Sequence, residues 1–318
     1  MIHYLSLKEH QLTKQEKEDA QTIWYLVEDP SFKEIDELTH KFNMRADYIT
    51  SILDDAENSR TEDFLQEEFT HPALLLLQYP ELLSSPSGYL QLNTYPFSIV
   101  ITPQKKIITI MKHEPQFLKK VMTHFYENND ISNSLKIFFQ LMWEITISYN
   151  YYLATIRKQC DLLESQLQVA TENSQLYQMM DIQKSLVYFE QATTSNMHAL
   201  QKIASHPTFE KNHGLKNHFH DILIETEQAM TSSKIQLKLV DQMNSTFSAI
   251  VSNNLNNIMK ILTSLTIVLT IPTIIGGLYG MNVKLPFAGR DDAFFWIGLI
   301  TILICILSIR YLKKKHLL

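Results

Sequence analysis

The sequence predicts an α+β fold in which an N-terminal α/β/α domain precedes a long helical stalk that continues into the first of two C-terminal transmembrane helices. Strand-like and helical segments alternate up to about Phe117, helical periodicity then continues without strands, and two long charge-free runs lie near the C-terminus. The 318 residues, 45% of them hydrophobic, suffice for a large core or two domains. We expect a cytosolic α/β domain with long helices over residues 1–211, a stalk and first transmembrane helix over 212–283, an outer loop over 284–292, and a second transmembrane helix with a basic tail over 293–318.

Turn residues and capping patterns predict the elements of the N-terminal domain. Thr13 with Glu16, and Ser31 with Glu34, match the capping box and predict the starts of two short helices. Apolar and β-branched runs predict strands over residues 22–27, 74–77, 89–94, 98–102 and 107–111, with turns at residues 84–88 and 102–103.

Beyond residue 117 the chain is expected to consist of long helices. Residues 137–156 are aromatic and apolar, but charges inside and beside this run, including Glu144, favour a buried cytosolic helix over a membrane span. An interruption is expected around Pro207. No glycine or proline separates Leu215 from the first charge-free run, so one helix is expected to continue from the cytosol into the bilayer.

Two charge-free runs are long enough to cross a membrane. Residues 261–283 span a hydrocarbon core of about 30 Å at the helical rise, and residues 293–309 form a second, shorter run that ends at Arg310. The connector carries two cations, whereas Lys260, Arg310, Lys313, Lys314 and Lys315 lie on the other side. The positive-inside rule therefore predicts a multi-pass protein of the cytoplasmic membrane with both termini in the cytoplasm.

The composition argues against several classes of function. A net charge of -6 and a pI near 6.1 argue against nucleic acid as a partner, and two cysteines predict no disulfide framework. The two glycines outside the membrane region, Gly88 and Gly214, do not form a phosphate-binding loop. The cytosolic part is therefore not expected to be an ATPase or a dinucleotide-dependent enzyme, and any transport should be passive.

One face of the first membrane helix is polar. Its members fall within an arc of about 100° at the helical period, and they are Ser252, Asn256, Met259, Thr263, Thr266, Thr270, Thr273 and Gly277. Small polar residues can pack between membrane helices or line a water-filled lumen, and the regular threonine spacing favours a lumen. One helix cannot enclose a pore, so this face predicts a homo-oligomer. Pro272 should free a backbone carbonyl and kink the helix.

Residues 276–282 read Gly-Gly-Leu-Tyr-Gly-Met-Asn and resemble the signature of the CorA family of magnesium channels, in which Gly-Met-Asn ends the first of two C-terminal membrane helices. The resemblance extends over residues 252–262, the C-terminal lysines, and the acidic stretch at residues 54–57 with Arg60 and Glu62. It implies a homopentamer that passes hydrated Mg²⁺ down its gradient, with Co²⁺ and Ni²⁺ as further candidate ions and intracellular divalent cation as the regulator.

The resemblance also implies roles for single residues. Gly280, Met281 and Asn282 would form the selectivity ring, where Asn282 amide oxygens accept hydrogen bonds from the waters that Mg²⁺ retains. Gly280 would permit a tight turn. The pore-facing positions would be Asn256, Met259, Leu262 and Thr273, with Met259 and Leu262 as an apolar constriction that gates by dewetting. Thr270 stands where the family frequently has methionine.

Regulation and ion preference leave alternatives open. Asp221 on the stalk would bind a regulatory divalent cation between subunits, or would be an ordinary solvated residue. Asp291 and Asp292 would attract cations or cap the second membrane helix. His213, His218 and His220 invite a zinc interpretation, although their spacing suits it poorly. A zinc transporter of the same superfamily and a membrane-anchored signalling scaffold therefore remain as alternative functions.

Overall fold

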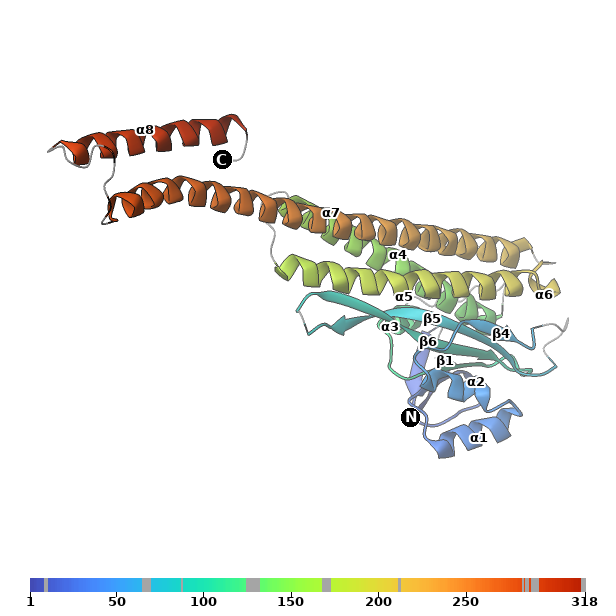
Figure 1. Cartoon of the computed structure of the whole chain (residues 1–318). Coiled ribbons are helices and arrows are strands. Elements are labelled where there is room, and N and C mark those ends of the chain that lie inside the picture. Colours follow the sequence, from blue (N-terminus) through green and yellow to red (C-terminus); the bar gives the residue numbers. More distant parts are fainter. Residues whose placement is uncertain are drawn as a thin grey trace. The chain divides into compact units, whose positions relative to one another are not determined.

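The computed structural model describes residues 1–8, 11–64, 70–86, 88–123, 132–167, 173–210, 213–281, 283, 286 and 292–315. The chain divides into two compact units, Met1–Asn244 and Ser245–Leu318 (Figure 1). A single helix, α7 (His213–Tyr279), contributes residues to both units. The unbroken helix expected from Leu215 into the membrane run is therefore present.

A seven-stranded mixed sheet forms the centre of the first unit, with strand order β2-β1-β3-β7-β6-β5-β4. The strands are β1 (Ile2–Lys8), β2 (Gln11–Gln15), β3 (Thr22–Glu28), β4 (Arg60–Glu62), β5 (Ala73–Ser84), β6 (Leu90–Ile101) and β7 (Ile107–Met111). Neighbouring strands are antiparallel, except for β3 and β7, which run parallel. A parallel pair needs a crossover connection, and here the segment between β3 and β7 contains the strands of the other sheet edge.

Helices cover both faces of this sheet (Figure 1). On one face lie α1 (Phe32–Phe42), α2 (Asp47–Thr50) and the 3-10 helix η1 (Ser51–Leu53), which enclose a buried cluster including Tyr25, Leu38 and Ile108. On the other face lie α4 (Asn133–Leu167) and α5 (Asn173–Ala204), joined by an edge-to-face contact of Tyr149 with Phe189. The short helices α3 (Phe117–Thr123) and α6 (Pro207–Glu210) and the part of α7 up to Asn244 also belong to the unit. This arrangement confirms the predicted α/β/α domain.

Asn196 on α5 attaches that helix to the backbone of β5. Its side chain accepts a hydrogen bond from the Gln78 N–H at 2.9 Å and donates one to the Gln78 carbonyl at 2.8 Å. The Ser59 hydroxyl donates to the same Asn196 oxygen at 2.6 Å, and the Tyr149 hydroxyl donates to the Gln78 carbonyl at 3.0 Å. Because β4 pairs with β5 only as far as Leu76, this buried amide satisfies the strand backbone just past the end of β4.

The part of α7 that belongs to the first unit has a core face with alternating spacings of three and four residues. The buried positions are Leu215, Phe219, Ile222, Thr226, Ala229, Ser233, Gln236 and Val240. Several are small or polar, and Thr226 and Ser233 donate their hydroxyl protons to carbonyls of α7 itself, at 2.7 Å each. Contacts with α4 include the ring pair Phe139 and Phe219, with centroids 4.8 Å apart.

The run at residues 137–156 is a buried helix of the first unit, as predicted. Its inward residues, including Ile137, Ile145 and Leu153, are at most 1% exposed. The interruption expected near Pro207 is also present, because α5 ends at Ala204 and α6 begins at Pro207.

Two local predictions are wrong. Thr13 and Glu16 do not start a helix, because Thr13 lies in β2 and pairs with Ser6 of β1. Residues 89–94 and 98–102 are not separate strands, because β6 runs unbroken from Leu90 to Ile101 through Pro96. The missing N–H of Pro96 is tolerated there because β7 pairs with β6 only from Ser98 onwards, which leaves one side of Pro96 without a strand partner.

Candidate functional site

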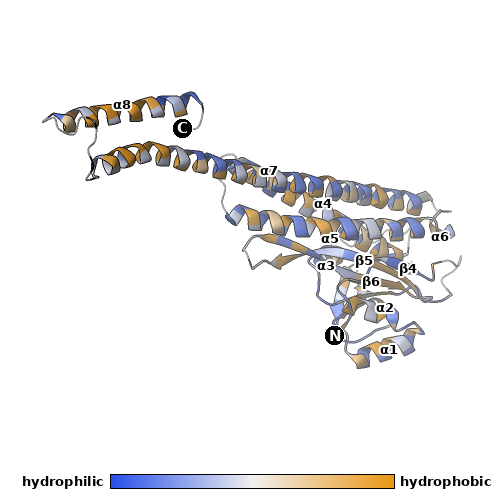
Figure 2. Cartoon of the chain, in the orientation of Figure 1, coloured by the Kyte–Doolittle hydropathy of each residue, from blue (hydrophilic) through white to orange (hydrophobic). Residues whose placement is uncertain are grey.

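Two helices of the second unit have the length and composition to cross a membrane. They are the C-terminal half of α7 and α8 (Ala293–Lys314). Figure 2 shows hydrophobic residues along both segments, and almost none of this apolar surface is buried within the chain. Two such helices fit a membrane location for this part of the protein.

One side of α7 packs against α8. Ser264 is 2% exposed, and the less exposed residues Val268, Ile271 and Ile275 follow it at spacings of four, three and four. On α8 the Cys305 thiol donates a weak hydrogen bond to the Val268 carbonyl at 3.9 Å. That carbonyl is the one deprived of its helical donor by Pro272, because proline has no N–H. The sequence predicts the freed carbonyl but not its contact with Cys305. The signal that could predict a helix contact on this side is the spacing of Ser264, Val268, Ile271 and Ile275.

The predicted polar face of α7 remains exposed. All its members, Ser252, Asn256, Met259, Thr263, Thr266, Thr270, Thr273 and Gly277, are exposed, as is Leu262 beside them. At the helical period this face is about 140° around α7 from the residues that contact α8. Within this chain α8 therefore leaves the polar face uncovered.

The threonine hydroxyls on that face have a common orientation. Thr266 donates to the Leu262 carbonyl at 2.8 Å, Thr270 to the Thr266 carbonyl at 2.7 Å, and Thr273 to the Leu269 carbonyl at 3.0 Å. Because each hydroxyl proton is used inside the helix, each oxygen retains lone pairs that can accept a further hydrogen bond. The polar face therefore presents oxygens that can accept hydrogen bonds from a molecule with many O–H donors.

A turn follows the end of α7 at Tyr279. Gly280 N donates to the Gly276 carbonyl at 2.9 Å, and the Tyr279 hydroxyl donates to the Pro286 carbonyl at 3.1 Å. Gly280 is not in the left-handed region, but a Cβ there would lie 3.2 Å from the Gly276 carbonyl oxygen. Glycine at position 280 therefore allows a close approach of the backbone and is not needed for a left-handed turn. Met281 is exposed, and Asn282 lies outside the described residues.

The segment between α7 and α8 is described only in part. Asp291 lies outside the described residues. Asp292 is the residue before the first turn of α8, yet its side chain makes no capping bond to the backbone and instead accepts from Trp296 Nε1 at 2.9 Å. The acidic side chain is therefore held by an aromatic residue of α8.

The described side chains of Asp221 and the neighbouring histidines do not form a cluster that could hold a metal ion. Asp221 and His220 are exposed, and the His218 ring contacts Phe139 with centroids 5.8 Å apart. The side chain of His213 lies outside the described residues. Across the described ranges, no group of three or more His, Cys, Asp or Glu is placed to hold a metal ion.

The acidic stretch at residues 54–57 is paired with basic residues. Arg60 bonds Glu57 and, at 2.7 Å, Glu62, while Lys112 bonds Asp55 at 2.9 Å. These pairs neutralise much of the negative charge in this part of the first unit.

Comparison with known proteins identifies the family. A family profile described as "CorA-like Mg2+ transporter protein" matches residues 19–314. The cobalt/magnesium transport protein CorA of Methanocaldococcus jannaschii is 24% identical over 317 residues, which cover 98% of this chain and 95% of that protein.

Solved structures share the fold. The complete structure of the CorA magnesium transporter from M. jannaschii has a TM-score of 0.80 at 20% identity, covering 99% of this chain and 98% of that one. The ZntB cytoplasmic domain from Vibrio parahaemolyticus RIMD 2210633 has a TM-score of 0.51 at 12% identity, covering 77% of this chain and 98% of that one. Because the family profile spans most of the sequence, the chain belongs to the CorA-like Mg²⁺ transporters, a family of membrane transporters rather than enzymes.

Proposed function

We propose that this chain forms a homo-oligomeric channel for passive uptake of hydrated Mg²⁺ across the cytoplasmic membrane, gated by intracellular divalent cation. The observation that carries the proposal is the exposed face of α7, where the oxygens of Thr266, Thr270 and Thr273 are free to accept hydrogen bonds. Mg²⁺ gives up its waters reluctantly, so a pathway for the hydrated ion needs acceptors for water protons rather than direct ligands.

Several copies of the chain are needed to enclose this pathway. The polar face belongs to one helix, and α8 lies on another side of α7. A ring of copies with these faces toward a common axis would form the lumen. The likeness to CorA supports a homopentamer, with Gly280, Met281 and Asn282 as the selectivity ring at the outer end.

The same helix contains the proposed gate. Met259 is 51% and Leu262 is 55% exposed, and both would narrow the lumen with apolar groups that gate by dewetting. Asp221, exposed on the cytosolic part of α7, would bind Mg²⁺ between neighbouring copies. Bound Mg²⁺ would remove the repulsion between carboxylates and favour the closed state. The lysines Lys260 and Lys313 to Lys315 support an orientation with both termini in the cytoplasm.

Flux into proteoliposomes tests the proposal. Wild-type protein should admit Mg²⁺ down its gradient, and the variant Thr266→Val/Thr270→Val should be several-fold slower because it loses two acceptor oxygens. Thr301→Val on α8 is the matched control, since Thr301 also donates to a carbonyl of its own helix, that of Ile297 at 2.7 Å, but is outside the polar face. Equal Mg²⁺ flux in the double variant and the control would contradict the assigned lining.

The same preparation separates the alternative functions. Competition among Mg²⁺, Co²⁺, Ni²⁺ and Zn²⁺ establishes ion preference, and preferential Zn²⁺ flux would identify a zinc transporter. The absence of any cation flux, together with an assembly too small to form a ring, would instead identify a membrane-anchored scaffold.

A further inference from the structure

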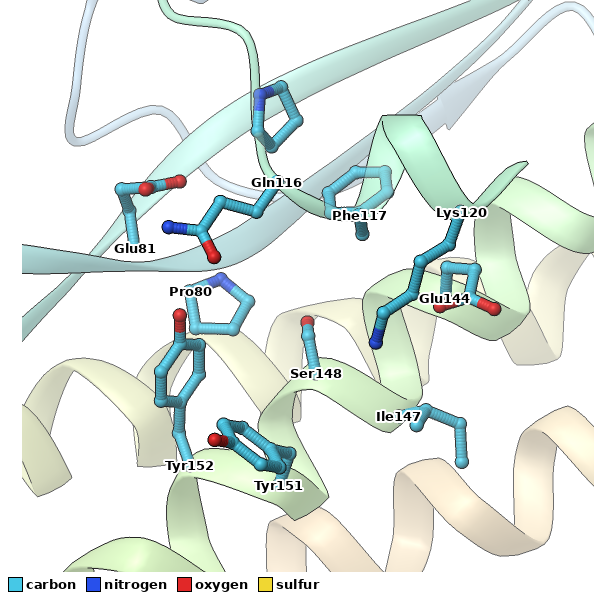
Figure 3. Close-up of a pocket in the computed structure, with 11 residues that line it drawn as sticks. Pro80, Glu81, Gln116, Phe117, Lys120, Glu144, Ile147, Ser148, Tyr151 and Tyr152 are labelled. Atoms are coloured by element: carbon cyan, nitrogen blue, oxygen red, sulfur yellow. The ribbon is translucent and has the colours of Figure 1, made fainter. Parts of the chain in front are cut away.

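The first unit contains a cavity far from the polar face in sequence. Its volume is about 330 Å³, and it lies between β5, the start of α3 and the middle of α4 (Figure 3). This volume is near the lower end of the range for small-molecule sites. The cavity therefore has room for a compact organic molecule of a few carbon atoms.

Two carboxylates line the cavity without a described partner. Glu81 on β5 and Glu144 on α4 are both half-buried, and neither makes a hydrogen bond or an ion pair among the described residues. Burial raises the pKa of Glu81, although the nearby His113 acts in the opposite direction. A half-buried carboxylate without a partner is unfavourable, and a cation bound beside it would remove that penalty.

Aromatic and apolar side chains form the remaining walls. Tyr151 and Tyr152 on α4 make an edge-to-face pair with centroids 5.4 Å apart, and Pro80 and Phe117 lie across from them. In Figure 3 the Tyr152 hydroxyl points toward Pro80, and the side-chain amide of Gln116 extends toward the same region. The Tyr152 hydroxyl makes no hydrogen bond among the described residues. Ring faces attract organic cations, and the hydroxyl oxygen can accept an ammonium proton.

The lining favours an organic cation over an anion or a metal ion. Its charged groups are Glu81, Glu144 and Lys120, so the formal charge of the lining is negative. Within the described part of the chain no cluster of three acidic, histidine or cysteine side chains is placed to hold a metal. Mg²⁺ also prefers octahedral oxygen ligands to aromatic walls.

We propose that this cavity binds a small alkylamine, with its ammonium group at Glu81 and Tyr152 and its hydrocarbon part against Pro80 and Phe117. This binding is separate from ion passage, and it would bridge β5, α3 and α4 of the first unit. The ligand class is a primary amine or diamine with a short carbon chain.

Isothermal titration of the full-length protein in detergent tests the proposal, with n-butylamine and 1,4-diaminobutane as probes at constant ionic strength. We expect saturable binding of at least one amine at one site per chain. Glu81→Gln should weaken this binding about tenfold or more, because it removes a charge-assisted hydrogen bond. Tyr152→Phe, which keeps the ring, should weaken it several-fold.

Glu164→Gln provides the matched control, because Glu164 is an exposed glutamate of α4 outside the cavity lining. Its affinity should equal that of the wild type, and circular dichroism should show that all variants are folded. The proposal is overturned if neither amine saturates, if n-butanol binds as well as n-butylamine, or if Glu81→Gln binds like Glu164→Gln. Displacement of the amine by MgCl₂ at constant ionic strength would also overturn it, by identifying a metal site.

Discussion

Replacing Asn196 with alanine should destabilise the first unit by about 3 kcal/mol. The substitution removes two hydrogen bonds to the Gln78 backbone and one from Ser59. The Gln78 carbonyl keeps the Tyr149 hydroxyl, but the Gln78 N–H loses its side-chain acceptor in a residue that is only 3% exposed. Leaving the buried Gln78 N–H unsatisfied costs about 1 to 3 kcal/mol, and the other two lost hydrogen bonds cost about 0.5 to 1.5 kcal/mol each, so a total of about 3 kcal/mol lies in the lower part of the combined range.

Urea unfolding followed by Trp24 fluorescence measures this loss. Trp24 is fully buried in the sheet and its indole N–H donates to Thr109 Oγ1 at 2.9 Å, so its emission reports on the first unit. A background of Trp143→Phe and Trp296→Phe leaves it as the single tryptophan. With a slope of about 3 kcal/mol/M, the midpoint should fall by about 1 M.

The control for this measurement is Gln191→Ala on the same helix. Gln191 is exposed and donates to Asn58 Oδ1 at 3.3 Å, so its loss should cost less than about 0.5 kcal/mol. If Asn196→Ala shifts the midpoint no more than Gln191→Ala does, the idea that Asn196 completes the backbone of β5 is refuted.

Three further substitutions test other contacts. Partial burial alone would raise the pKa of Glu18, but hydrogen bonds from Lys41, Tyr25 and Lys106 lower it from 4.5 to about 2. The contribution of Glu18 to the free energy of unfolding is therefore full above pH 4.5 and is lost as the pH falls to about 2. Glu18→Gln should cost about 1 kcal/mol at pH 7 after solvent screening. The Trp24 unfolding curves of variant and wild type should converge in acid. Ser31→Ala removes the capping box of α1 and should cost about 1 kcal/mol in the same assay, and an unchanged midpoint would contradict this role. Gly280→Ala places a methyl group 3.2 Å from the Gly276 carbonyl oxygen and should reduce Mg²⁺ flux, whereas Gly276→Ala, whose Cβ meets no described atom beyond the neighbouring backbone of its own helix within 4 Å, should not.

Long-period patterns in the sequence predicted the architecture well. The two apolar helices, the unbroken α7 and the buried helix at residues 137–156 all follow from charge-free length and hydrophobic periodicity. Predictions from these patterns are reliable because each pattern depends on many residues, so no single local preference can change the result.

Short patterns predicted less. The capping box at Thr13 and Glu16 concerns only local hydrogen bonds. This segment instead forms strand β2, which pairs with β1, and the sequence does not reveal that pairing. Pro96 suggested a break between strands. However, β7 pairs with β6 only from Ser98 onwards, so on that side no strand partner requires an N–H at Pro96. The same limit applies to the candidate site. The threonine spacing indicated a polar face on α7, but the direction of each hydroxyl bond depends on side-chain geometry that spacing alone cannot give.

The parallel pairing of β3 with β7 has a consequence for synthesis of the chain. Residues 22–28 can pair with β1 at once, but they find their second partner only after residues 107–111 have left the ribosome, so the sheet cannot close early. Every strand of the sheet, and α4 and α5 on its face, nevertheless precede the first membrane segment in the sequence. The elements of the sheet and its helices can therefore assemble before any hydrophobic helix requires a bilayer.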